Sequence, residues 1–440
     1  MAGLRDTLAR LALLRRRLDR FLKSAAQHAT TAFGPTDVGR LSEVVGFGSN
    51  PGHLRMLGYT PKNLPKASAL VVALHGCTQT AAAYDHGSGW SMLADRHEFA
   101  LLFPEQQHAN NPNACFTWFD PANTKRNRGE AISIRQMIER MIRDHGIDRG
   151  RVFIVGLSAG GAMTSAMLAA YPEVFAGGAI IAGLPHGSAT TLQDAFEAMA
   201  QPRDRLAEEW GEVVRSASSH RGPWPKLSVW HGSADPIVNP RNAEQIVKQW
   251  TNVHALSAEP DLVHQVAGHE RRVWRDQAGA EVIEAYIVSG MGHGVPLATG
   301  HGLERCGHVA PFHFDVGLSS SWQVAKFWGI TAECPAMTAE RADSVASGAL
   351  LPLPERLAAE AFPAIGARAP TIEAAAQSFK HSAHTDGQGA DAHGNPLDPR
   401  EVITAALQKA GLLVPPGSNP TDDPRSIISR TLRSVGLLKE

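Results

Sequence analysis

Residues 152 to 161 read Val-Phe-Ile-Val-Gly-Leu-Ser-Ala-Gly-Gly, an apolar run followed by a Gly-x-Ser-x-Gly turn centred on Ser158. This pattern predicts a nucleophile elbow, in which the chain reverses sharply from strand to helix and exposes the serine hydroxyl at the carboxyl edge of a sheet. Gly156 and Gly160 are expected because larger side chains would collide in such a turn. A pentapeptide of this kind also arises by chance, so its meaning depends on the surrounding sequence.

Other apolar runs recur along the chain, with segments of helical pattern between them. Runs that are apolar throughout, without alternation, are typical of strands buried on both faces of a parallel sheet. Residues 130–145 carry an apolar stripe at helical spacing. The pattern predicts a doubly wound α/β fold with a mostly parallel central sheet flanked by helices. The runs are Ala69-Leu-Val-Val-Ala-Leu, Ala100-Leu-Leu-Phe, Val152-Phe-Ile-Val, Gly178-Ala-Ile-Ile-Ala, Leu227-Ser-Val-Trp and Ile283-Glu-Ala-Tyr-Ile-Val.

A hairpin is predicted at the end of this series. Arg271-Arg-Val-Trp-Arg is followed by the turn-forming segment Asp276-Gln-Ala-Gly-Ala, and a second apolar run begins at Val282. We expect the second strand of this hairpin to be the last strand of the sheet.

The chain has 440 residues, more than one domain usually holds. We predict an α/β catalytic domain over residues 34–335. Residues 1–33 are basic and place leucines on one helical face, which predicts an amphipathic helix that packs on its own protein or, alternatively, contacts a granule or membrane surface. Residues 336–440 form a C-terminal extension with two capped-helix repeats, 398–413 and 423–438. We expect the repeats to dock on the main domain or a second subunit; a polymer-binding module is the alternative.

Composition narrows the classes of function. Hydrophobic residues make up 43% of the chain, charged residues 19%, and the net charge is −1, which disfavours nucleic acid as a partner. No stretch approaches the roughly 18 apolar residues of a membrane-spanning helix. Arg10 and the triplet Arg15 to Arg17 interrupt any apolar core of a secretion signal. We therefore expect no export signal and a cytoplasmic location.

The four cysteines and the late histidines show no metal-binding spacing. Cys77, Cys115, Cys306 and Cys334 form no C-x-x-C pair, and without an export signal free thiols are the default expectation, although two disulfides are arithmetically allowed. Whether Cys77 is bridged to Cys115, or Cys306 to Cys334, stays open. We interpret most of the late histidines as ordinary loop residues and predict no metal or cofactor; they are His293, His301, His308 and His313.

Candidate partners for Ser158 follow it in the chain. A serine hydroxyl needs a histidine base and a carboxylate that orients the imidazole, in the order Ser, Asp or Glu, His in this type of fold. Asp235 lies just after the predicted strand Leu227-Ser-Val-Trp, and His293 lies between glycines after the last strand. Because the carboxyl ends of parallel strands meet at one edge, we predict Ser158, Asp235 and His293 as a catalytic triad.

An oxyanion hole requires two backbone N–H groups that face the developing negative charge. Ala159, directly after the predicted nucleophile, supplies one. The turn Leu74-His-Gly-Cys, after an early strand, places the Cys77 amide as the other.

Several segments together resemble the poly(3-hydroxybutyrate) depolymerase esterase family, which also includes feruloyl and acetylxylan esterases. The resemblance covers roughly residues 45 to 330 and implies an α/β-hydrolase fold, a short-chain polyhydroxyalkanoate or related ester as substrate, and Ser158, Asp235 and His293 as the family triad. Trp118 is a candidate for the wall of the acyl pocket, or else a core residue. The segments are Leu74-His-Gly-Cys-Thr-Gln-Thr-Ala, Pro104-Glu-Gln-Gln, Cys115-Phe-Thr-Trp-Phe-Asp-Pro, Gly156-Leu-Ser-Ala-Gly-Gly-Ala-Met, Tyr171-Pro-Glu-Val-Phe-Ala-Gly-Gly, Gly290-Met-Gly-His, Asp315-Val-Gly-Leu-Ser-Ser and Phe327-Trp-Gly.

Two departures from the family pattern bear on function. Leu184-Pro-His-Gly-Ser stands where Pro-Tyr-Gly-Cys is expected. Many members are exported and carry a linker and a polymer-binding domain, neither of which is visible here, so an extracellular location is the alternative expectation. The competing functions are a feruloyl, acetylxylan or general short-chain carboxylesterase, an inactive hydrolase-fold binding protein and, with least support, a peptidase.

Overall fold

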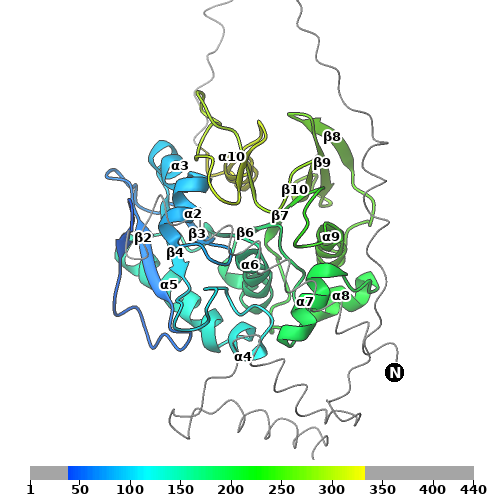
Figure 1. Ribbon diagram of the computed structural model, residues 1–440, viewed down its shortest axis with the longest axis horizontal. Coiled ribbons are helices and arrows are strands. Elements are labelled where there is room, and N and C mark those ends of the chain that lie inside the picture. The colour runs from blue at the N-terminus through cyan, green and yellow to red at the C-terminus, as the bar shows by residue number, and fades with distance from the viewer. Residues whose placement is uncertain (1–37, 332–440) are drawn as a thin grey trace, which may run out of the picture. The chain divides into compact units, whose positions relative to one another are not determined.

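The computed structural model describes residues 38–331, all within the first of two units of the chain, Met1–Ala346. Figure 1 shows this part as a central sheet with helices on both sides. The helices predicted within 1–33, 398–413 and 423–438 lie outside the described residues.

Ten strands form the central sheet in the order β1-β2-β4-β3-β5-β6-β7-β10-β9-β8. The six strands from β4 to β10 in that order run parallel, and each contains one of the six apolar runs of the sequence, so this prediction is confirmed. The parallel strands are β4 (Ala100–Glu105), β3 (Leu70–Leu74), β5 (Val152–Leu157), β6 (Gly177–Ile181), β7 (Lys226–Gly232) and β10 (Glu281–Val288).

Antiparallel strands extend both edges of the sheet. The predicted hairpin is confirmed: β9 pairs with β10, the last strand of this sheet along the chain. Three of the four edge strands are not predicted from the sequence, because one has only two residues and the other two mix polar with apolar residues. The edge strands are β1 (Ser42–Glu43), β2 (Arg55–Tyr59), β9 (His269–Arg275) and β8 (Leu262–Val266).

Alternate side chains of β3 enter two separate cores. Leu70, Val72 and Leu74 pack in one core and Val71 and Ala73 in the other. The first core lies under α5 (Gly129–His145), α6 (Ala159–Ala170) and α9 (Arg241–Val253), and the second under α2 (Ala81–Ser88), α3 (Trp90–His97) and α10 (Ser320–Trp328). Because both faces are covered, every residue of this strand is buried, which explains its continuous apolar sequence. Burial of each such aliphatic side chain contributes about 1.5–3 kcal/mol.

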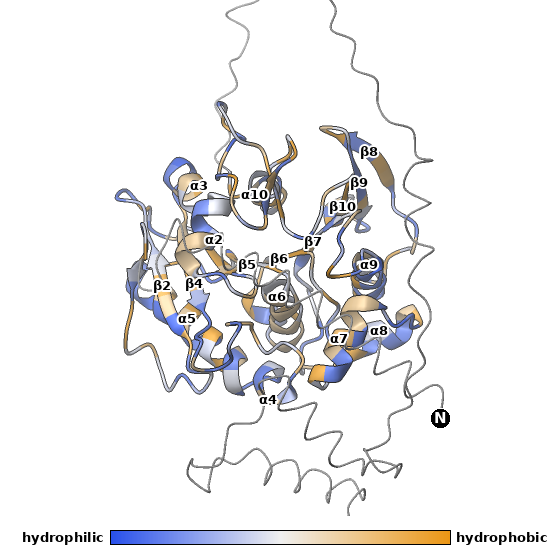
Figure 2. Cartoon of the chain, in the orientation of Figure 1, coloured by the Kyte–Doolittle hydropathy of each residue, from blue (hydrophilic) through white to orange (hydrophobic). Residues whose placement is uncertain are grey.

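Helices cover both faces, as the doubly wound pattern predicts. Gly129 begins α5 one residue before the predicted segment, and α5 ends before Gly146, whose φ of 63° stops the helix. Both hydrophilic and hydrophobic residues occur along α5 in Figure 2. Among residues 38–331, no helix is long and apolar enough to cross a membrane. The helices are α2 (Ala81–Ser88), α3 (Trp90–His97), α4 (Pro121–Thr124), α5 (Gly129–His145), α6 (Ala159–Ala170), η1 (Pro172–Val174), α7 (Leu192–Ala200), α8 (Ala207–Arg215), α9 (Arg241–Val253) and α10 (Ser320–Trp328).

A small two-stranded parallel sheet, β11 (Val295–Leu297) with β12 (His313–Asp315), follows the central sheet along the chain. It comes directly after the loop that carries His293.

Candidate active site

Ser158 lies in a strained turn between β5 and α6. Its φ of 57° and ψ of −116° are outside the regions that L-residues prefer, as a nucleophile elbow requires. A Cβ atom on Gly156 would lie 2.2 Å from the Gly160 carbonyl oxygen, and one on Gly160 would lie 2.4 Å from the Leu74 carbonyl oxygen. The expectation that both positions exclude side chains is confirmed. The turn is close-packed against the end of β3.

A pocket of about 530 Å³ opens beside the serine. Ser158 and His293 both line it, and the walls come from the loop after β3, the segment 110–119, α7 and Phe312. The lining contains no Asp, Glu, Lys or Arg side chain, and Cys77 and Cys115 are bonded to each other. The pocket therefore suits an uncharged, largely apolar group. Its apolar side chains include Phe116, Trp118, Phe119, Leu157, Leu192, Phe196, Met199, Ile237 and Phe312.

Asp235 and His293 form a direct pair. The His293 Nδ1 lies 2.7 Å from the Asp235 Oδ2, and only 4% of the histidine side chain is exposed. Because a carboxylate only accepts hydrogen bonds, Nδ1 carries the proton and Nε2 presents its lone pair. The other carboxylate oxygen accepts the backbone N–H groups of Ile237 (2.8 Å) and Val238 (3.0 Å). The imidazole is thus held in the tautomer that can accept a proton at Nε2.

Two loops at neighbouring strand ends bring this pair together. Asp235 follows β7 and His293 follows β10, which are adjacent parallel strands. A Cβ atom on Gly232 would lie 2.3 Å from the Met291 carbonyl oxygen, so glycine allows the loops to touch. The Ala234 N–H donates to that same oxygen at 3.0 Å. The two strand-end positions predicted from sequence therefore lie in contact in the structure.

The backbone near Cys77 is held in one orientation. The Gly76 carbonyl oxygen accepts from His75 Nδ1 (2.7 Å) and from the Gln79 N–H (3.3 Å), while the Gly76 N–H donates to the Gln79 Oε1 (2.8 Å). In a trans peptide the C=O and the following N–H point in opposite directions. Fixing the Gly76 carbonyl therefore directs the Cys77 N–H the other way, and Cys77 lines the pocket with Ser158.

Ala159 begins α6, so its N–H has no carbonyl partner within the helix. It lies at the positive end of the helix dipole. Ala159 follows Ser158 in the chain and Cys77 lines the same pocket as Ser158, so their two amides stay the predicted donors of the oxyanion hole.

Comparison with known proteins places this geometry in a family. The family model described as "Esterase PHB depolymerase" matches residues 57–263. "Poly(3-hydroxyalkanoate) depolymerase C" of Paucimonas lemoignei is 44% identical over 300 residues, which are 68% of this chain and 72% of that protein. The chain belongs to the PHB depolymerase esterase family. It is a carboxylic ester hydrolase with the α/β-hydrolase fold.

Two further similarities agree with this membership. An "Acetylxylan esterase" of Coprinopsis cinerea is 33% identical over 270 residues, covering 59% of this chain and 70% of that one. Among solved structures, "Acetyl xylan esterase from Aspergillus awamori" superposes with a TM-score of 0.57 at 25% identity, covering 67% of this chain and all of that one.

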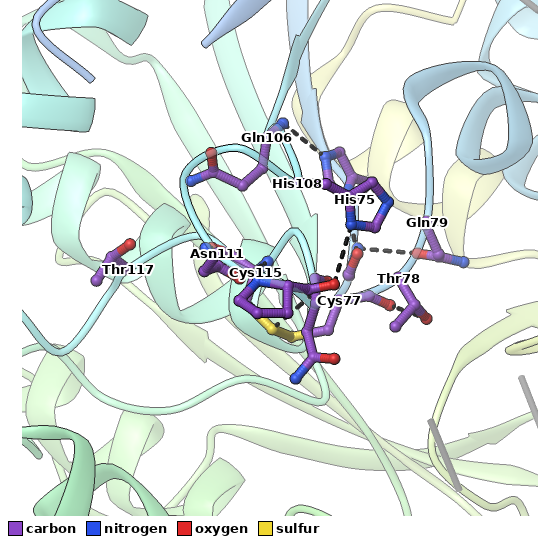
Figure 3. Close-up of a disulfide and its surroundings, with 12 residues drawn as sticks. His75, Cys77, Thr78, Gln79, Gln106, His108, Asn111, Cys115 and Thr117 are labelled. Carbon is purple, nitrogen blue, oxygen red and sulfur yellow. Dashed lines mark hydrogen bonds between the residues drawn. A yellow bond between two sulfur atoms is a disulfide. The ribbon is translucent and has the colours of Figure 1, made fainter. Parts of the chain in front are cut away.

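A disulfide joins two of the segments that line the esterase pocket, contrary to the expected free thiols. Cys77, in the turn after β3, is bonded to Cys115, 38 residues later, with the two Cα atoms 4.3 Å apart (Figure 3). The expectation was wrong because it rested on an absent export signal, whereas the pairing depends on loops that meet only in the fold. Cys306 is a buried free thiol, and Cys334 lies outside the described residues.

A buried carboxyl holds the segment that carries Cys115. Glu130, on α5, accepts the Thr117 N–H (2.9 Å) and hydroxyl (2.7 Å) and the Gln106 Nε2 (2.7 Å). Burial raises the pKa of Glu130 to about 7, against the effect of these hydrogen bonds. The Gln106 N–H donates to the His75 Nε2 at 3.0 Å, so Nδ1 is the protonated nitrogen of His75 (Figure 3). Sequence reasoning missed this network because its members are far apart in the chain.

His231, at the end of β7, also contacts the Asp235 carboxylate. Its Nε2 lies 3.2 Å from the Asp235 Oδ2, the same oxygen that His293 contacts. Burial alone would raise the pKa of Asp235, but His293 and His231 outweigh burial and hold that pKa below its ordinary value. The sequence offered one signal that was not used: a histidine four residues before the candidate aspartate.

The remaining late histidines lie apart from the pair. His308 stacks on His86 with ring centroids 4.2 Å apart, and His301 is exposed. His313 is buried, which lowers its pKa to about 4. Within the described part of the chain, no group of His, Cys, Asp and Glu side chains is arranged to hold a metal ion.

Trp118 and the variant segment after β6 occupy defined places. Trp118 is half-buried and lines the pocket of this esterase, with its ring edge-on to Phe119 at 5.7 Å. Ser188, where a cysteine is expected from the family pattern, is buried.

Proposed function

We propose that this esterase hydrolyses short-chain poly(3-hydroxyalkanoates), as polymer or oligomers, through an acyl-enzyme on Ser158. The observation that carries the proposal is that Ser158 and His293 line one pocket while His293 is bonded to Asp235. The 44% identity to a poly(3-hydroxyalkanoate) depolymerase supports the choice of substrate.

The chemistry proceeds in two halves. The Ser158 Oγ attacks the ester carbonyl carbon while His293 Nε2 takes the hydroxyl proton, and Asp235 keeps the resulting imidazolium in place. The tetrahedral intermediate collapses, the C–O bond to the alcohol breaks, and His293 returns the proton to the leaving alkoxide. Water then attacks the acyl-serine with His293 as base, which releases the acid and restores the hydroxyl.

The Cys77 and Ala159 amides stabilise the charge on the carbonyl oxygen during both halves. Loss of one such donor costs roughly 3–4 kcal/mol of activation free energy in other hydrolases. Here the donors are backbone groups, so the conformation of the turn, and not the identity of the Cys77 side chain, supplies the stabilisation.

The pocket supports a neutral acyl group. Its lining lacks Asp, Glu, Lys and Arg side chains, so a free carboxylate or amine gains no ion pair there. The aromatic walls of Trp118, Phe119 and Phe196 favour one alternative, a feruloyl-type ester with an aromatic acyl group. Substrate comparison has to separate the two.

The substrate test compares release rates from three esters: hydroxybutyrate oligomers, methyl ferulate and acetylated xylan. We expect the oligomers to give the highest kcat/KM, and amorphous poly(3-hydroxybutyrate) granules to release soluble hydroxybutyrate products. A higher kcat/KM on methyl ferulate would overturn the substrate assignment.

The nucleophile test uses Ser158→Ala. We expect this variant to keep no more than a trace of activity and to lose labelling by a fluorophosphonate probe that reacts with the parent protein. Absence of labelling in the parent would instead support an inactive, binding function. Substantial activity in the variant would exclude Ser158 as the nucleophile.

The disulfide bears on location. Disulfides persist in oxidising compartments and are rare in the cytosol. The Cys77–Cys115 bond therefore supports an extracellular location over the cytoplasmic one expected from sequence. Contact of residues 1–33 with a polymer surface stays a prediction from their basic amphipathic sequence. Deleting them should lower activity on granules more than activity on soluble oligomers if that contact exists.

A further inference from the structure

The catalytic carboxylate proposed above has a second histidine partner that the triad does not include. His231 belongs to β7, and neither its side chain nor that of Asp235 is exposed to solvent. Its Nε2 faces two acceptors at once: the Asp235 Oδ2 at 3.2 Å and the Val238 carbonyl oxygen at 3.0 Å.

These two acceptors fix the tautomer of His231. A nitrogen between two oxygen acceptors carries the proton, so Nε2–H is the donor. The Nδ1 is buried, and no hydrogen-bond partner lies near it within the described residues. A second proton on Nδ1 would bury a charge and an unpaired donor, which is costly, so the neutral Nε2–H imidazole fits the site.

The Asp235 carboxylate therefore has four nitrogen atoms within 3.2 Å. Oδ1 accepts hydrogen bonds from the Ile237 and Val238 amides, and Oδ2 lies 2.7 Å from the His293 Nδ1 and 3.2 Å from the His231 Nε2. Loss of His231 would leave Oδ2 with a single side-chain donor. The charge of that oxygen would then act on His293 alone.

We propose that His231 is a positioning residue of the esterase reaction, which fixes the Asp235 carboxylate and shares its Oδ2 with His293 so that the His293 base is less strongly bound to its proton. The inference rests on the proposed function, because it assigns His231 a role relative to that triad. His231 itself does not line the substrate pocket.

Few other ionisable side chains act on the Asp235–His293 pair. The ionisable side chains that act most strongly on Asp235 are His293 and His231. His293 lines the pocket together with Ser158 and uncharged side chains, and Phe312 lies edge-on to its ring at 6.3 Å. A change at His231 therefore reaches His293 mainly through Asp235.

The decisive variant is His231→Phe, which keeps an aromatic ring and removes the donor. We expect the acid limb of the pH profile of kcat/KM to move to higher pH by about half to one unit. Without the His231 contact, the Asp235 Oδ2 stabilises the His293 imidazolium more strongly. The plateau kcat should fall roughly 3- to 10-fold, with KM unchanged, because the carboxylate is less firmly oriented. His231→Gln, which can place an N–H near the same oxygen, should return the limb towards its original position.

A matched control removes another enclosed histidine. His254 contacts the Pro225 carbonyl oxygen at 3.1 Å through Nε2, at the end of α9, and does not line the pocket. His254→Phe should lower the unfolding temperature without moving the acid limb. An acid limb that stays in place in a folded His231→Phe variant would overturn the proposal.

A second measurement needs no turnover. Nitrogen NMR of ¹⁵N-histidine-labelled Ser158→Ala protein follows the titration midpoint of His293 directly, with and without His231→Phe. An upward shift of the midpoint supports the role of His231, and an unchanged midpoint overturns it. Failure of the proposed function would show differently, as esterase activity that survives Ser158→Ala.

Discussion

The two sides of the pocket are held by different forces. On the triad side, Asp235 and His293 come from loops that follow adjacent strands and are joined by backbone contacts and by the hydrogen bond between the two side chains. On the oxyanion side, the turn around Cys77 is held by neutral side chains and by a disulfide to a segment that follows a different strand. The first side depends on a buried carboxylate and its hydrogen bonds, and the second depends on the geometry of a loop.

Because of this difference, mutations on the two sides should have different effects on turnover and on stability. Damage to the triad side removes a proton acceptor or its orientation, which lowers turnover while the fold survives. Damage to the oxyanion side loosens the segments that form the pocket, so stability and turnover should change together.

The largest effect is expected from Asp235→Asn on the triad side. The asparagine NH₂ group donates a hydrogen bond to the His293 Nδ1, whereas the carboxylate accepts one from it. His293 then adopts the wrong tautomer, and kcat should fall about 10⁴-fold. Steady-state kinetics on a soluble ester measure the loss, and thermal unfolding should show that the variant is folded.

Asp120→Asn is the matched control. Asp120 caps α4 by accepting the Ala122 N–H at 2.8 Å, and asparagine caps helices about as well. Its kcat should equal that of the parent. An Asp235→Asn variant with a tenth or more of the parent kcat would show that the carboxylate does not orient the base.

Sequence and structure agree most closely where local patterns decide the outcome. The six buried strands can be predicted from the sequence because burial on both faces requires continuous apolar runs. The Ser158 turn was readable because close packing excludes side chains at Gly156 and Gly160. The Asp235–His293 pair followed from strand-end positions that converge in parallel sheets.

The oxyanion side was less readable because its contacts join residues distant in the chain. Nothing local indicates that Cys115 meets Cys77, or that Glu130 on a helix anchors Thr117. His231 was missed for another reason: its place beside Asp235 depends on how the chain turns after β7. Apolar periodicity carries information on burial and very little on which polar groups meet.

The second-largest effect is expected from removal of the disulfide. Replacing both bridged cysteines, as Cys77→Ser with Cys115→Ser, releases a loop of 38 residues in the unfolded chain. We expect the free energy of unfolding to fall by roughly 2–4 kcal/mol. Guanidinium titration of the variant and the parent measures the change, and kcat should fall as well because the Cys77 turn is less restrained.

Cys306→Ser provides the control, since that thiol is buried and unbridged. A reductant such as dithiothreitol should lower the unfolding temperature of Cys306→Ser and of the parent equally, and leave the double variant unchanged. If reduction alters none of the three, the bond does not stabilise the oxyanion side.

The third effect is a pH dependence of stability from Glu130. Its pKa of about 7 in the folded protein exceeds the ordinary 4.5, so the folded state holds this proton more tightly than the unfolded state does. The stabilisation is complete below about pH 4.5 and is lost as the pH rises through 7, with a size on the order of 3 kcal/mol. Unfolding free energies measured across this range should decline with pH.

Glu130→Gln should flatten that decline, because glutamine does not titrate. The variant should also be about 1 kcal/mol less stable at low pH. The Thr117 amide and hydroxyl donate to different oxygens of Glu130, and in glutamine one of these oxygens becomes an NH₂ group, which accepts no hydrogen bond. A variant with the same slope as the parent would assign the pH dependence to other groups.

The smallest effect is expected from Gln79→Leu on the oxyanion side. The Gln79 Oε1 accepts the Gly76 N–H at 2.8 Å, and this bond helps to fix the peptide plane that directs the Cys77 N–H. Without it the His75 contact to the Gly76 carbonyl still restrains the turn, so kcat should fall only about 10-fold, which corresponds to roughly 1.4 kcal/mol of activation free energy.

Gln136→Leu is the matched control, because Gln136 accepts the Asn50 N–H at 3.0 Å and does not line the pocket. A tenfold loss of kcat in Gln79→Leu, but not in Gln136→Leu, would show that a neutral side chain sets the geometry of the oxyanion donor. Equal kcat in both variants would mean that His75 and the disulfide hold the turn without Gln79.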